Sequence, residues 1–195
     1  MRIPPIVFAM SLLTTSCEKA EPDEFIDIVF DPCETIFLEV QSTFSNEQYE
    51  AVRQAGRMWN DLLGSSIGIS ELAANMDVYQ DGDAPFSVAD RTIPVVFDRA
   101  AEAFRGYYDD ENGVIYINDR LAIENIAYTL AHEIGHSFGL FHIEKTNRIS
   151  VMNHGNMSIA PNREDAKAVE NLWGICTSRW EHVAVKPLQR SHQVD

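Results

Sequence analysis

Apolar residues recur at two spacings along the chain, and these spacings predict its helices and strands. Apolar positions three or four residues apart indicate helices at residues 46–63, 119–138 and 163–173. Short runs rich in β-branched and aromatic residues indicate strands at residues 35–40, 67–72, 77–80, 92–98 and 113–118. Most of these strands lie between the first two helices. This order predicts one α+β domain, a mixed β-sheet with helices packed on it.

Cap residues mark the ends of the predicted helices. Ser45 precedes the first helix and Gln48 completes an S-x-x-Q capping box, while Gly64 follows the last turn. Gly174 ends the third helix. The boundaries of the first helix therefore rest on its caps as well as on its periodicity.

The second predicted helix ends in the sequence H-E-x-x-H-x-x-G-x-x-H, which spans residues 132–142. Helical residues advance by about 100°, so His132 and His136 lie one turn apart on one face. His142 would leave that face if the helix continued, because six more residues rotate it by about 240°. Gly139 allows the chain to break and turn back, since glycine adopts positive φ at little cost. The motif therefore predicts three histidines around one point.

Three neutral imidazoles are a typical ligand set for catalytic zinc, because they leave one tetrahedral position open for water. Zinc lowers the pKa of this water to about 7. Glu133 is the expected general base, which takes the proton of the water and delivers it to the leaving amine. The histidines could instead be structural, but this full pattern arises by chance in about one chain of this length in 10⁵. We therefore expect one catalytic Zn²⁺ ion bound by His132, His136 and His142.

Residues 132–142 match the complete zinc signature of the metzincin metallopeptidases, and the sequence resembles that family at further places. Ser150, Val151 and Met152 are similar to its Met-turn, in which a methionine lies beneath the zinc as an apolar floor. The alternative for Met152 is an ordinary core methionine. The resemblance covers about residues 35–174. It implies a zincin fold with a twisted mixed β-sheet, an active-site helix, a Met-turn and a C-terminal helix.

Three more segments resemble parts of a metzincin domain. Residues 107–118 are similar to the segment that ends in an antiparallel edge strand above the cleft, where substrate adds as an extended strand. Residues 165–174 resemble the final helix of matrixin-type members. By the same resemblance, residues 153–161 are expected to form the wall of the S1′ pocket. The resemblance thus implies a matrixin-like zinc endopeptidase whose substrate is a protein or peptide.

The chain departs from known metzincin subfamilies at several places. Ile143 follows the third histidine, where matrixins commonly have Ser and astacins have Glu. His154 stands where astacins have a Tyr that approaches the zinc. This histidine is either an oxyanion donor or cleft wall, or an exposed loop residue, and we favour the exposed loop. No matrixin-type cysteine switch is visible, and no pro-domain of ordinary length fits before Thr35.

The N-terminal region has the pattern of an export signal followed by a tether. Residues 6–13 are apolar but too few to span a bilayer, which is typical of a secretory signal peptide. The residues before Cys17 are similar to a bacterial lipoprotein box, so we expect a lipid anchor there; simple secretion and a buried N-terminal strand are the alternatives. The chain therefore divides into a signal peptide, an acidic tether, a catalytic domain and a tail at residues 1–16, 17–34, 35–178 and 179–195.

Charge and cysteine content limit the remaining functions. The chain has 30 acidic and 15 basic residues and a net charge of −15, which argues against nucleic-acid binding because phosphates would be repelled. In an oxidising compartment Cys33 and Cys176 could pair and join the ends of the domain, or they could remain isolated thiols. Asp109, Asp110 and Glu111 could bind Ca²⁺, although a solvated acidic turn is the favoured interpretation.

Two alternatives to an active endopeptidase remain. The chain could be a non-catalytic binding or adhesion module that keeps the zinc fold, although an intact Glu133 argues against an inert site. It could also be a latent, self-processing peptidase. Latency needs a group that reaches the zinc, and the candidates are Cys33 as a thiolate, Asp23, Asp27 and Asp31. We expect an exported, monomeric zinc endopeptidase at the outer membrane or cell surface, or otherwise a periplasmic or secreted one.

Overall fold

The computed structural model describes residues 26–40, 44–71, 91–98, 105–144, 148–156 and 158–176. The predicted signal peptide, the predicted lipid-anchor residue Cys17, the predicted strand at residues 77–80 and the C-terminal tail lie outside these residues. Within the described part of the chain, no helix is both long and apolar enough to cross a membrane.

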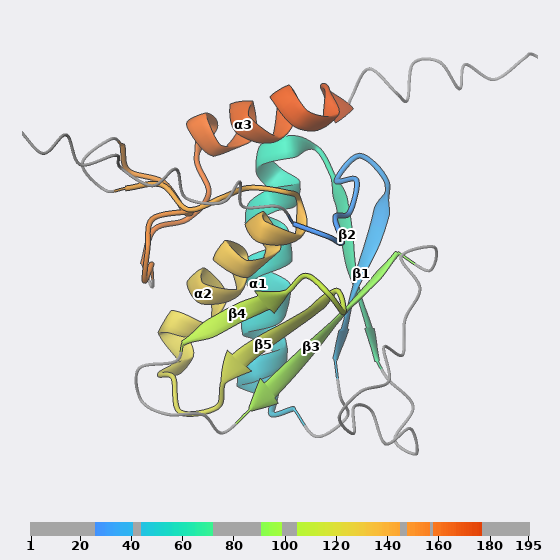
Figure 1. Ribbon diagram of the computed structural model, residues 1–195. Helices are drawn as coiled ribbons and strands as arrows, with labels where there is room; N and C mark the ends of the chain where they lie inside the picture. Colours follow the sequence, from blue (N-terminus) through green and yellow to red (C-terminus); the bar gives the residue numbers. More distant parts are fainter. Residues whose placement is uncertain are drawn as a thin grey trace, which may run out of the picture.

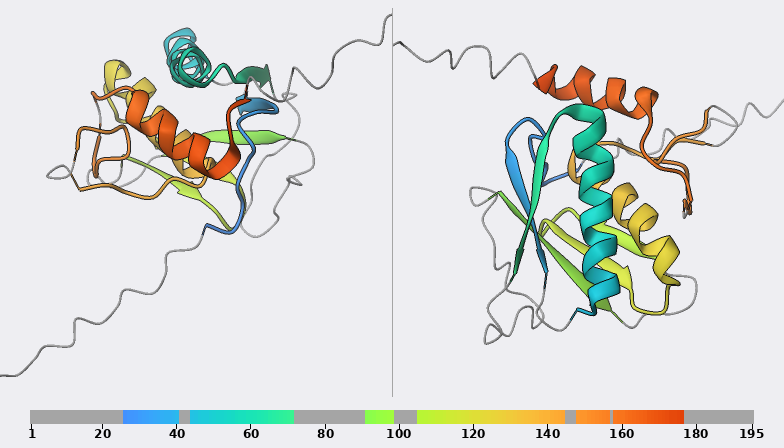
Figure 2. Two further views of the ribbon diagram at one scale, coloured as in Figure 1. Left: turned by 90° about the horizontal axis from the view of Figure 1, so that it is seen from above. Right: turned by 180° about the vertical axis from the view of Figure 1, so that it is seen from behind.

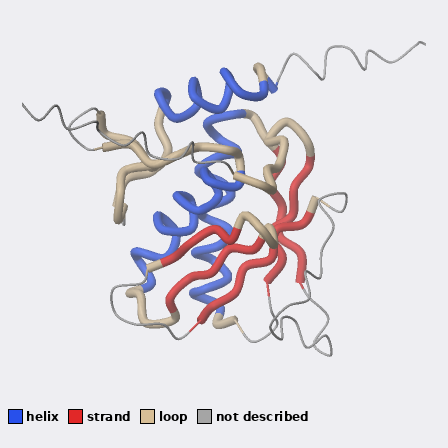
Figure 3. The backbone as a smooth tube through the Cα atoms, viewed as in Figure 1, coloured by secondary structure: helices blue, strands red, loops and turns tan. Residues whose placement is uncertain are grey.

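A five-stranded mixed β-sheet forms one layer of the fold (Figure 1). Its strands in chain order are β1 (Thr35–Val40), β2 (Ser66–Glu71), β3 (Thr92–Asp98), β4 (Gly106–Asp109) and β5 (Val114–Asn118). In space the order is β2-β1-β3-β5-β4, and among these described strands β4 alone runs antiparallel to its neighbour. Figure 3 shows the strands side by side in a twisted sheet. The predicted α+β fold with a mixed sheet and an antiparallel edge strand is confirmed.

The identity of the edge strand differs from the prediction. We expected the segment 107–118 to end in the edge strand, but β5, at the end of that segment, lies inside the sheet. It pairs in parallel with β3 on one side and antiparallel with β4 on the other. Gly113, at φ +69°, turns the chain between β4 and β5. The free edge therefore belongs to β4, which begins at Gly106 and is only four residues long.

Two helices cover one face of the sheet and a third lies at one end. In Figure 1 the strands lie in front of α1 (Asn46–Leu63) and α2 (Ile123–Ser137), and in the rear view of Figure 2 α1 lies in front of them. The third helix, α3 (Arg163–Trp173), lies above this layer in Figure 1. The Ser45 capping box is present, and Gly64 ends α1 at φ 66°. These caps fix α1 at its predicted ends.

The second helix is shorter than predicted at its start. We expected it from residue 119, but α2 begins at Ile123. The backbone carbonyl of Asn118 accepts a hydrogen bond from Leu121 N–H at 3.1 Å, and its side-chain oxygen accepts one from Arg120 N–H at 3.0 Å. These local bonds hold a turn between β5 and α2, which delays the helix by about one turn.

Trp59 anchors α1 to α2 in the core. Its side chain is fully buried, and its Nε1–H donates to the carbonyl of Ala131 at 2.8 Å. Its ring meets Phe138 edge to face, with centroids 5.4 Å apart. Because Ala131 directly precedes His132, this contact fixes the position of the predicted metal-binding turn against α1.

The end of the predicted tether packs on the domain. Phe30 is 4% exposed, and its N–H donates to the carbonyl of Ser137 at 2.8 Å. Ile28 N–H donates to the carbonyl of Asp110 at 3.0 Å. The described residues 26–34 therefore belong to the domain, in contrast to the tether predicted for residues 17–34, because an apolar side chain and backbone hydrogen bonds bind them to it.

A disulfide closes the domain at its two ends. Cys33, before β1, is bonded to Cys176, after α3, with a sequence separation of 143 residues. Both residues are buried. A disulfide sulfur offers no thiolate, so the pairing removes Cys33 from the candidates for a latency ligand.

Candidate metal centre

The helix α2 places three residues of the motif in the interior of the domain. His132 and Glu133 are 5% and 4% exposed, and His136 is half-buried. The helix lies between α1 on one side and the edge of the sheet on the other, so this turn is flanked by packed elements. Burial of three polar side chains on one turn is costly unless each finds a partner.

A glycine turn brings the third histidine back to the first two. Gly139 has φ +88°, its N–H donates to His136 O at 2.8 Å, and Leu140 N–H donates to Gly135 O at 3.0 Å. This pair of bonds is a Schellman motif, which ends α2 and reverses the chain. The Nε2 atom of His142 consequently lies 3.1 Å from Nε2 of His132 and 3.2 Å from Nε2 of His136.

The three imidazoles fit a metal ion. Nδ1 of His132 lies 2.6 Å from Val151 O, and Nδ1 of His136 lies 2.7 Å from Leu140 O. A carbonyl oxygen only accepts, so each Nδ1 carries a proton and each Nε2 keeps its lone pair toward the other rings. Nitrogen ligands on a tetrahedral zinc ion are about 3.3 Å apart, close to the spacing seen here. Among the described residues, His132, His136 and His142 are the group that could hold a metal ion.

The protein environment keeps these histidines neutral. Burial, followed by the neighbouring imidazoles His132 and His142, lowers the pKa of His136 to about 3. Burial, followed by the neighbouring imidazoles of His132 and His154, lowers the pKa of His142 to about 4. Burial also lowers the pKa of His132. Metal binding requires unprotonated imidazoles, so the ligand set is ready for a cation at neutral pH.

Glu133 lies in a different electrostatic setting on the same turn. Burial raises the pKa of its carboxyl to about 8, and a hydrogen bond from the backbone of Tyr108 on β4 partly offsets that rise. A carboxyl with a pKa near neutrality can both take up and release a proton. The contact also shows that the edge strand β4 directly flanks the motif.

Met152 packs against the helix turn that carries His132 and His136. It is fully buried, and a Cβ atom placed on Gly135 would come within 2.4 Å of its sulfur. A side chain at residue 135, between His132 and His136 of the same helix, would therefore have to displace Met152. The sequence carries one signal for this contact, since a glycine inside a buried helix indicates close packing.

A buried carboxylate on α3 holds the turn at residues 150–152. Asp165, which is fully buried, accepts hydrogen bonds from the hydroxyl of Ser150 and from Val151 N–H, the latter at 3.2 Å. Val151 in turn offers its carbonyl to His132. Asp165 thus orients a ligand through one peptide group. In the sequence, Asp165 stands at the third position of a capping box that begins at Asn162. That pattern accounts for its bond with Asn162 but not for those with Ser150 and Val151.

Two buried asparagines fix the rest of this loop. Asn153 donates from Nδ2 to the carbonyls of Ile143 and Arg148, at 2.8 and 3.1 Å. Asn156 donates from Nδ2 to the carbonyls of Val151 and Ile159, at 3.1 and 2.7 Å. The loop therefore owes its shape to side-chain amides, which replace the missing backbone ladder.

His154 is exposed, as expected, but it is not isolated in its loop. Its ring stacks on the ring of His142, with centroids 3.9 Å apart and planes tilted by 32°. The exposed loop position agrees with the favoured interpretation, and the ring of His154 additionally contacts the third histidine of the motif.

The acidic turn after β4 uses its carboxylates within the protein. Asp109 accepts hydrogen bonds from the backbone and side-chain amides of Asn112, at 3.2 and 2.9 Å. Asp110 accepts one from the backbone N–H of Asp27 at 3.1 Å. These bonds link the turn to itself and to the N-terminal segment, and they leave calcium binding as an untested alternative.

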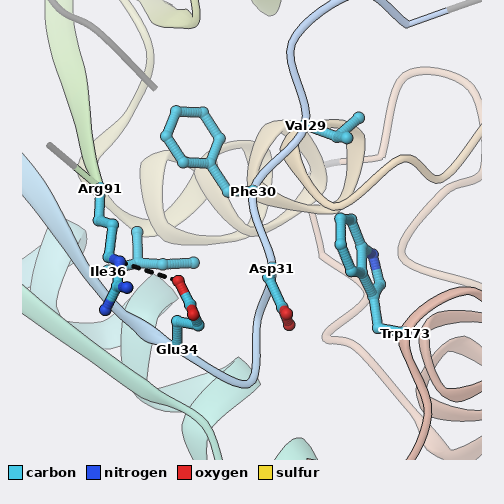
Figure 4. Close-up of a pocket in the computed structure, with 7 residues that line it drawn as sticks. All are labelled: Val29, Phe30, Asp31, Glu34, Ile36, Arg91 and Trp173. Atoms are coloured by element: carbon cyan, nitrogen blue, oxygen red, sulfur yellow. Dashed lines mark ion pairs between the residues drawn. The ribbon is translucent and has the colours of Figure 1, made fainter. Parts of the chain in front are cut away.

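A cavity of about 310 Å³ lies away from the histidines (Figure 4). It is lined by Val29, Phe30, Asp31, Glu34, Ile36, Arg91 and Trp173. Arg91 and Glu34 form an ion pair of 2.8 Å on one side, and Asp31 and Trp173 lie on the other. None of the motif residues lines it, so this cavity is not the metal centre.

Comparisons with known proteins give distant matches in structure and none in sequence. No family model matches the chain, and no curated protein sequence matches it. The archaemetzincin of Methanopyrus kandleri is 15% identical, with a TM-score of 0.48 over 71% of this chain and 95% of that one. Myroilysin is 10% identical, with a TM-score of 0.47 over 74% and 82%. High choriolytic enzyme 1, a hatching enzyme zinc-protease of Oryzias latipes, is 12% identical, with a TM-score of 0.43 over 76% and 94%. At these values the matches do not establish a family for this chain.

Proposed function

We propose that this protein is a zinc-dependent endopeptidase that hydrolyses peptide bonds in proteins or peptides. The observation that carries the proposal is the convergence of three imidazole Nε2 atoms beside Glu133, all within one packed turn and its following loop. The complete H-E-x-x-H-x-x-G-x-x-H signature supports membership of the metzincins, with matrixin-like as the proposed subfamily.

His132, His136 and His142 would hold the zinc ion, and Met152 would support them from below. When bound, zinc supplies Lewis acidity, which lowers the pKa of water to about 7 and polarises a carbonyl group. The hydrogen bonds from His132 to Val151 and from His136 to Leu140 fix the orientation of both rings. They also raise the basicity of the ligand nitrogens.

Glu133 would carry the proton in this reaction. Its carboxyl is buried and accepts a hydrogen bond from the Tyr108 backbone, which fixes its position beside the edge strand. From there it would take a proton from the attacking water and donate it to the leaving amine. A substrate would lie along the free edge of β4, since the backbone groups of Gly106 and Tyr108 face away from β5 there.

We further propose that the mature chain is exported and lipid-anchored through Cys17, with residues 1–16 removed as a signal peptide. The disulfide between Cys33 and Cys176 supports an oxidising compartment, because such bonds persist there. Metabolic labelling with a radioactive fatty acid tests the anchor. Label that persists in Cys17→Ser would contradict it.

The test of the enzyme is cleavage of an unfolded protein by the purified chain without its signal peptide, compared with Glu133→Ala. We expect Glu133→Ala to lose at least about 100-fold in rate while it keeps its zinc. The matched control is Glu124→Ala, which changes an exposed acid in the first turn of the same helix. Equal cleavage by Glu133→Ala would refute the assigned mechanism. Zinc binding without any cleavage would favour the binding module, and cleavage of the chain alone would favour the self-processing peptidase.

A further inference from the structure

Two flanks border the metal centre, and one arginine joins them. The strand flank is residues 105–109, which include β4, and the loop flank is residues 148–156, which include Met152. Arg105 precedes β4, and its Nη1 atom donates a hydrogen bond to the carbonyl of Gly155. The two residues are 50 positions apart in sequence, so this contact depends on the tertiary fold.

Gly155 is shaped for this contact in two ways. Its φ is +63°, a conformation that other residues adopt only with strain. A Cβ atom at residue 155 would also lie 2.7 Å from Nη1 of Arg105. Glycine therefore provides both the backbone turn and the space for the guanidinium.

The register of β4 relates Arg105 to the proposed reaction. Asn118 N–H donates to the carbonyl of Arg105 at 2.8 Å, so the polar backbone groups of Gly106 and Tyr108 alternate toward the free edge. At that edge the backbone of Tyr108 forms a hydrogen bond with the carboxyl group of Glu133. Arg105 lies three residues earlier, about 10 Å along an extended strand.

Antiparallel pairing with β4 would set the direction of a bound peptide. A peptide that pairs antiparallel with β4 runs opposite to it, so residues on the C-terminal side of the cleaved bond lie toward Arg105. About 10 Å corresponds to two or three extended residues beyond Glu133. A peptide that continues along this edge meets the bond between Arg105 and Gly155 and must displace it.

We propose that Arg105 is a specificity residue that binds a carboxylate two or three residues after the cleaved bond, an inference that rests on the proposed peptidase function. The guanidinium, once displaced from the Gly155 carbonyl, can bind a carboxylate of the peptide with two parallel hydrogen bonds. The protein carries a net charge of −15 and otherwise repels acidic peptides, so a local cation at this point would decide which of them bind. The carboxylate comes from an acidic side chain or from the C-terminus of a short peptide.

The test uses four matched peptides that share one cleaved bond. They carry Glu or Gln at the second and third positions after it, each with a free or an amidated C-terminus. In the wild type we expect a carboxylate to raise kcat/KM by about tenfold. Arg105→Gln should abolish that ratio and Arg105→Lys should keep part of it. Arg53→Gln changes the charge by the same amount at an exposed position of α1 and should keep the full ratio.

The four peptides also separate the two sources of the carboxylate. A preference for Glu with either terminus identifies a side chain, whereas a preference for free over amidated termini identifies the C-terminus. Equal kcat/KM for all four peptides in the wild type would overturn the proposal. An unchanged ratio in a folded Arg105→Gln variant with full zinc content would do the same.

Binding to the Glu133→Ala variant separates this inference from the proposed function. We expect the fluorescence anisotropy of labelled peptides to give about tenfold tighter Kd values for the carboxylate peptides, without any cleavage. If the wild type does not cleave, the peptidase proposal fails, and these Kd values still decide whether Arg105 selects a carboxylate. Equal Kd values would refute the selection.

Discussion

The strand flank and the loop flank border the same metal centre but are built by different forces. β4 is held by a backbone ladder with β5, and Gly106 lets it approach α2 closely. The loop flank has one backbone bridge, between Ile143 and Asn153, and two short backbone turns. Most of its other described bonds come from side chains. One flank is therefore held by the backbone ladder of a local hairpin, whereas the other depends on distant polar partners.

The two flanks also differ in what lies buried within them. On the loop side the buried polar residues cluster, and they are Ser150, Asn153, Asn156 and Asp165. A buried polar group contributes only if every partner is in place, because an unpaired one is costly. Removal of one partner in the loop flank should therefore weaken several hydrogen bonds together and cause a large loss in the free energy of unfolding. Steric changes in the strand flank should cause a smaller loss.

Removal of the carboxylate of Asp165 should have the largest effect on stability. Asp165→Ala leaves the Ser150 hydroxyl and the N–H groups of Val151 and Asn162 without their acceptor. We expect a loss of about 3 kcal/mol in the free energy of unfolding, measured with urea, together with weaker zinc binding. Glu164→Ala changes the exposed neighbour and should leave the urea midpoint nearly unchanged. Equal midpoints for the two variants would contradict the cooperative loop.

Steric pressure on the strand flank should cost less. A Cβ atom at Gly106 would lie 2.9 Å from Thr129 Cγ2 and 3.0 Å from Ile117 Cδ1. Gly106→Ala should therefore destabilise the fold by about 2 kcal/mol through overpacking. Thr129→Ser removes one of the clashing atoms, and a double-mutant cycle should show that it restores part of the loss. Strict additivity would show that β4 does not approach α2 as described.

The stability of the zinc-free protein should depend on pH in two ways, because burial raises the pKa of Glu133 and lowers the pKa values of the three histidines. Burial raises the pKa of Glu133 from 4.5 to about 8, so the folded chain holds an extra proton in that window. Stability then falls as pH rises, by at most about 1.4 kcal/mol per pH unit. The lowered pKa values of the three histidines act below pH 6.5, where the unfolded chain binds more protons and stability falls as pH decreases.

The maximum stability of zinc-free protein is therefore expected near pH 6.5, and thermal melts after chelation would measure it. Glu133→Gln should remove the decline between pH 6.5 and 8 and keep the decline at lower pH. A decline above pH 6.5 that persists in this variant would show that another group titrates. Added zinc should raise the melting temperature at neutral pH, since it binds the folded state.

The smallest effect concerns the stack of His154 on His142. His154→Ala removes the ring, and we expect zinc to dissociate about threefold faster, as measured by transfer to a coloured chelator. His154→Phe keeps an aromatic ring and should restore the slower rate. If both variants release zinc like the wild type, the stack does not position the third ligand.

Sequence periodicity predicted the regular elements well where one local pattern determined them. The bounds of α1, α3, β1 and β3 agree with the expected residues. The α2 start was misplaced because side-chain and backbone bonds at Asn118 hold a turn there. β4 was missed as the free edge because four residues are too few to show an alternation.

In the candidate site, too, the sequence predicted the features that a local pattern determines and missed those that depend on packing. The motif spacing predicted that His132, His136 and His142 meet, since helix geometry and one glycine turn determine it. The contact between Arg105 and Gly155 and the role of Asp165 could not be predicted. Each depends on the packing of separate elements, which no local pattern in a single sequence specifies.

The disulfide between Cys33 and Cys176 makes nearly the whole domain a covalent ring. A cut at any one peptide bond within the ring leaves a single molecule, because both pieces stay joined through the sulfurs. If copies of this protein nick one another, the damage stays invisible on a gel until a reductant separates the fragments. The nicked chain would stay joined around its three histidines, so the ring would protect the protein from the activity proposed for it.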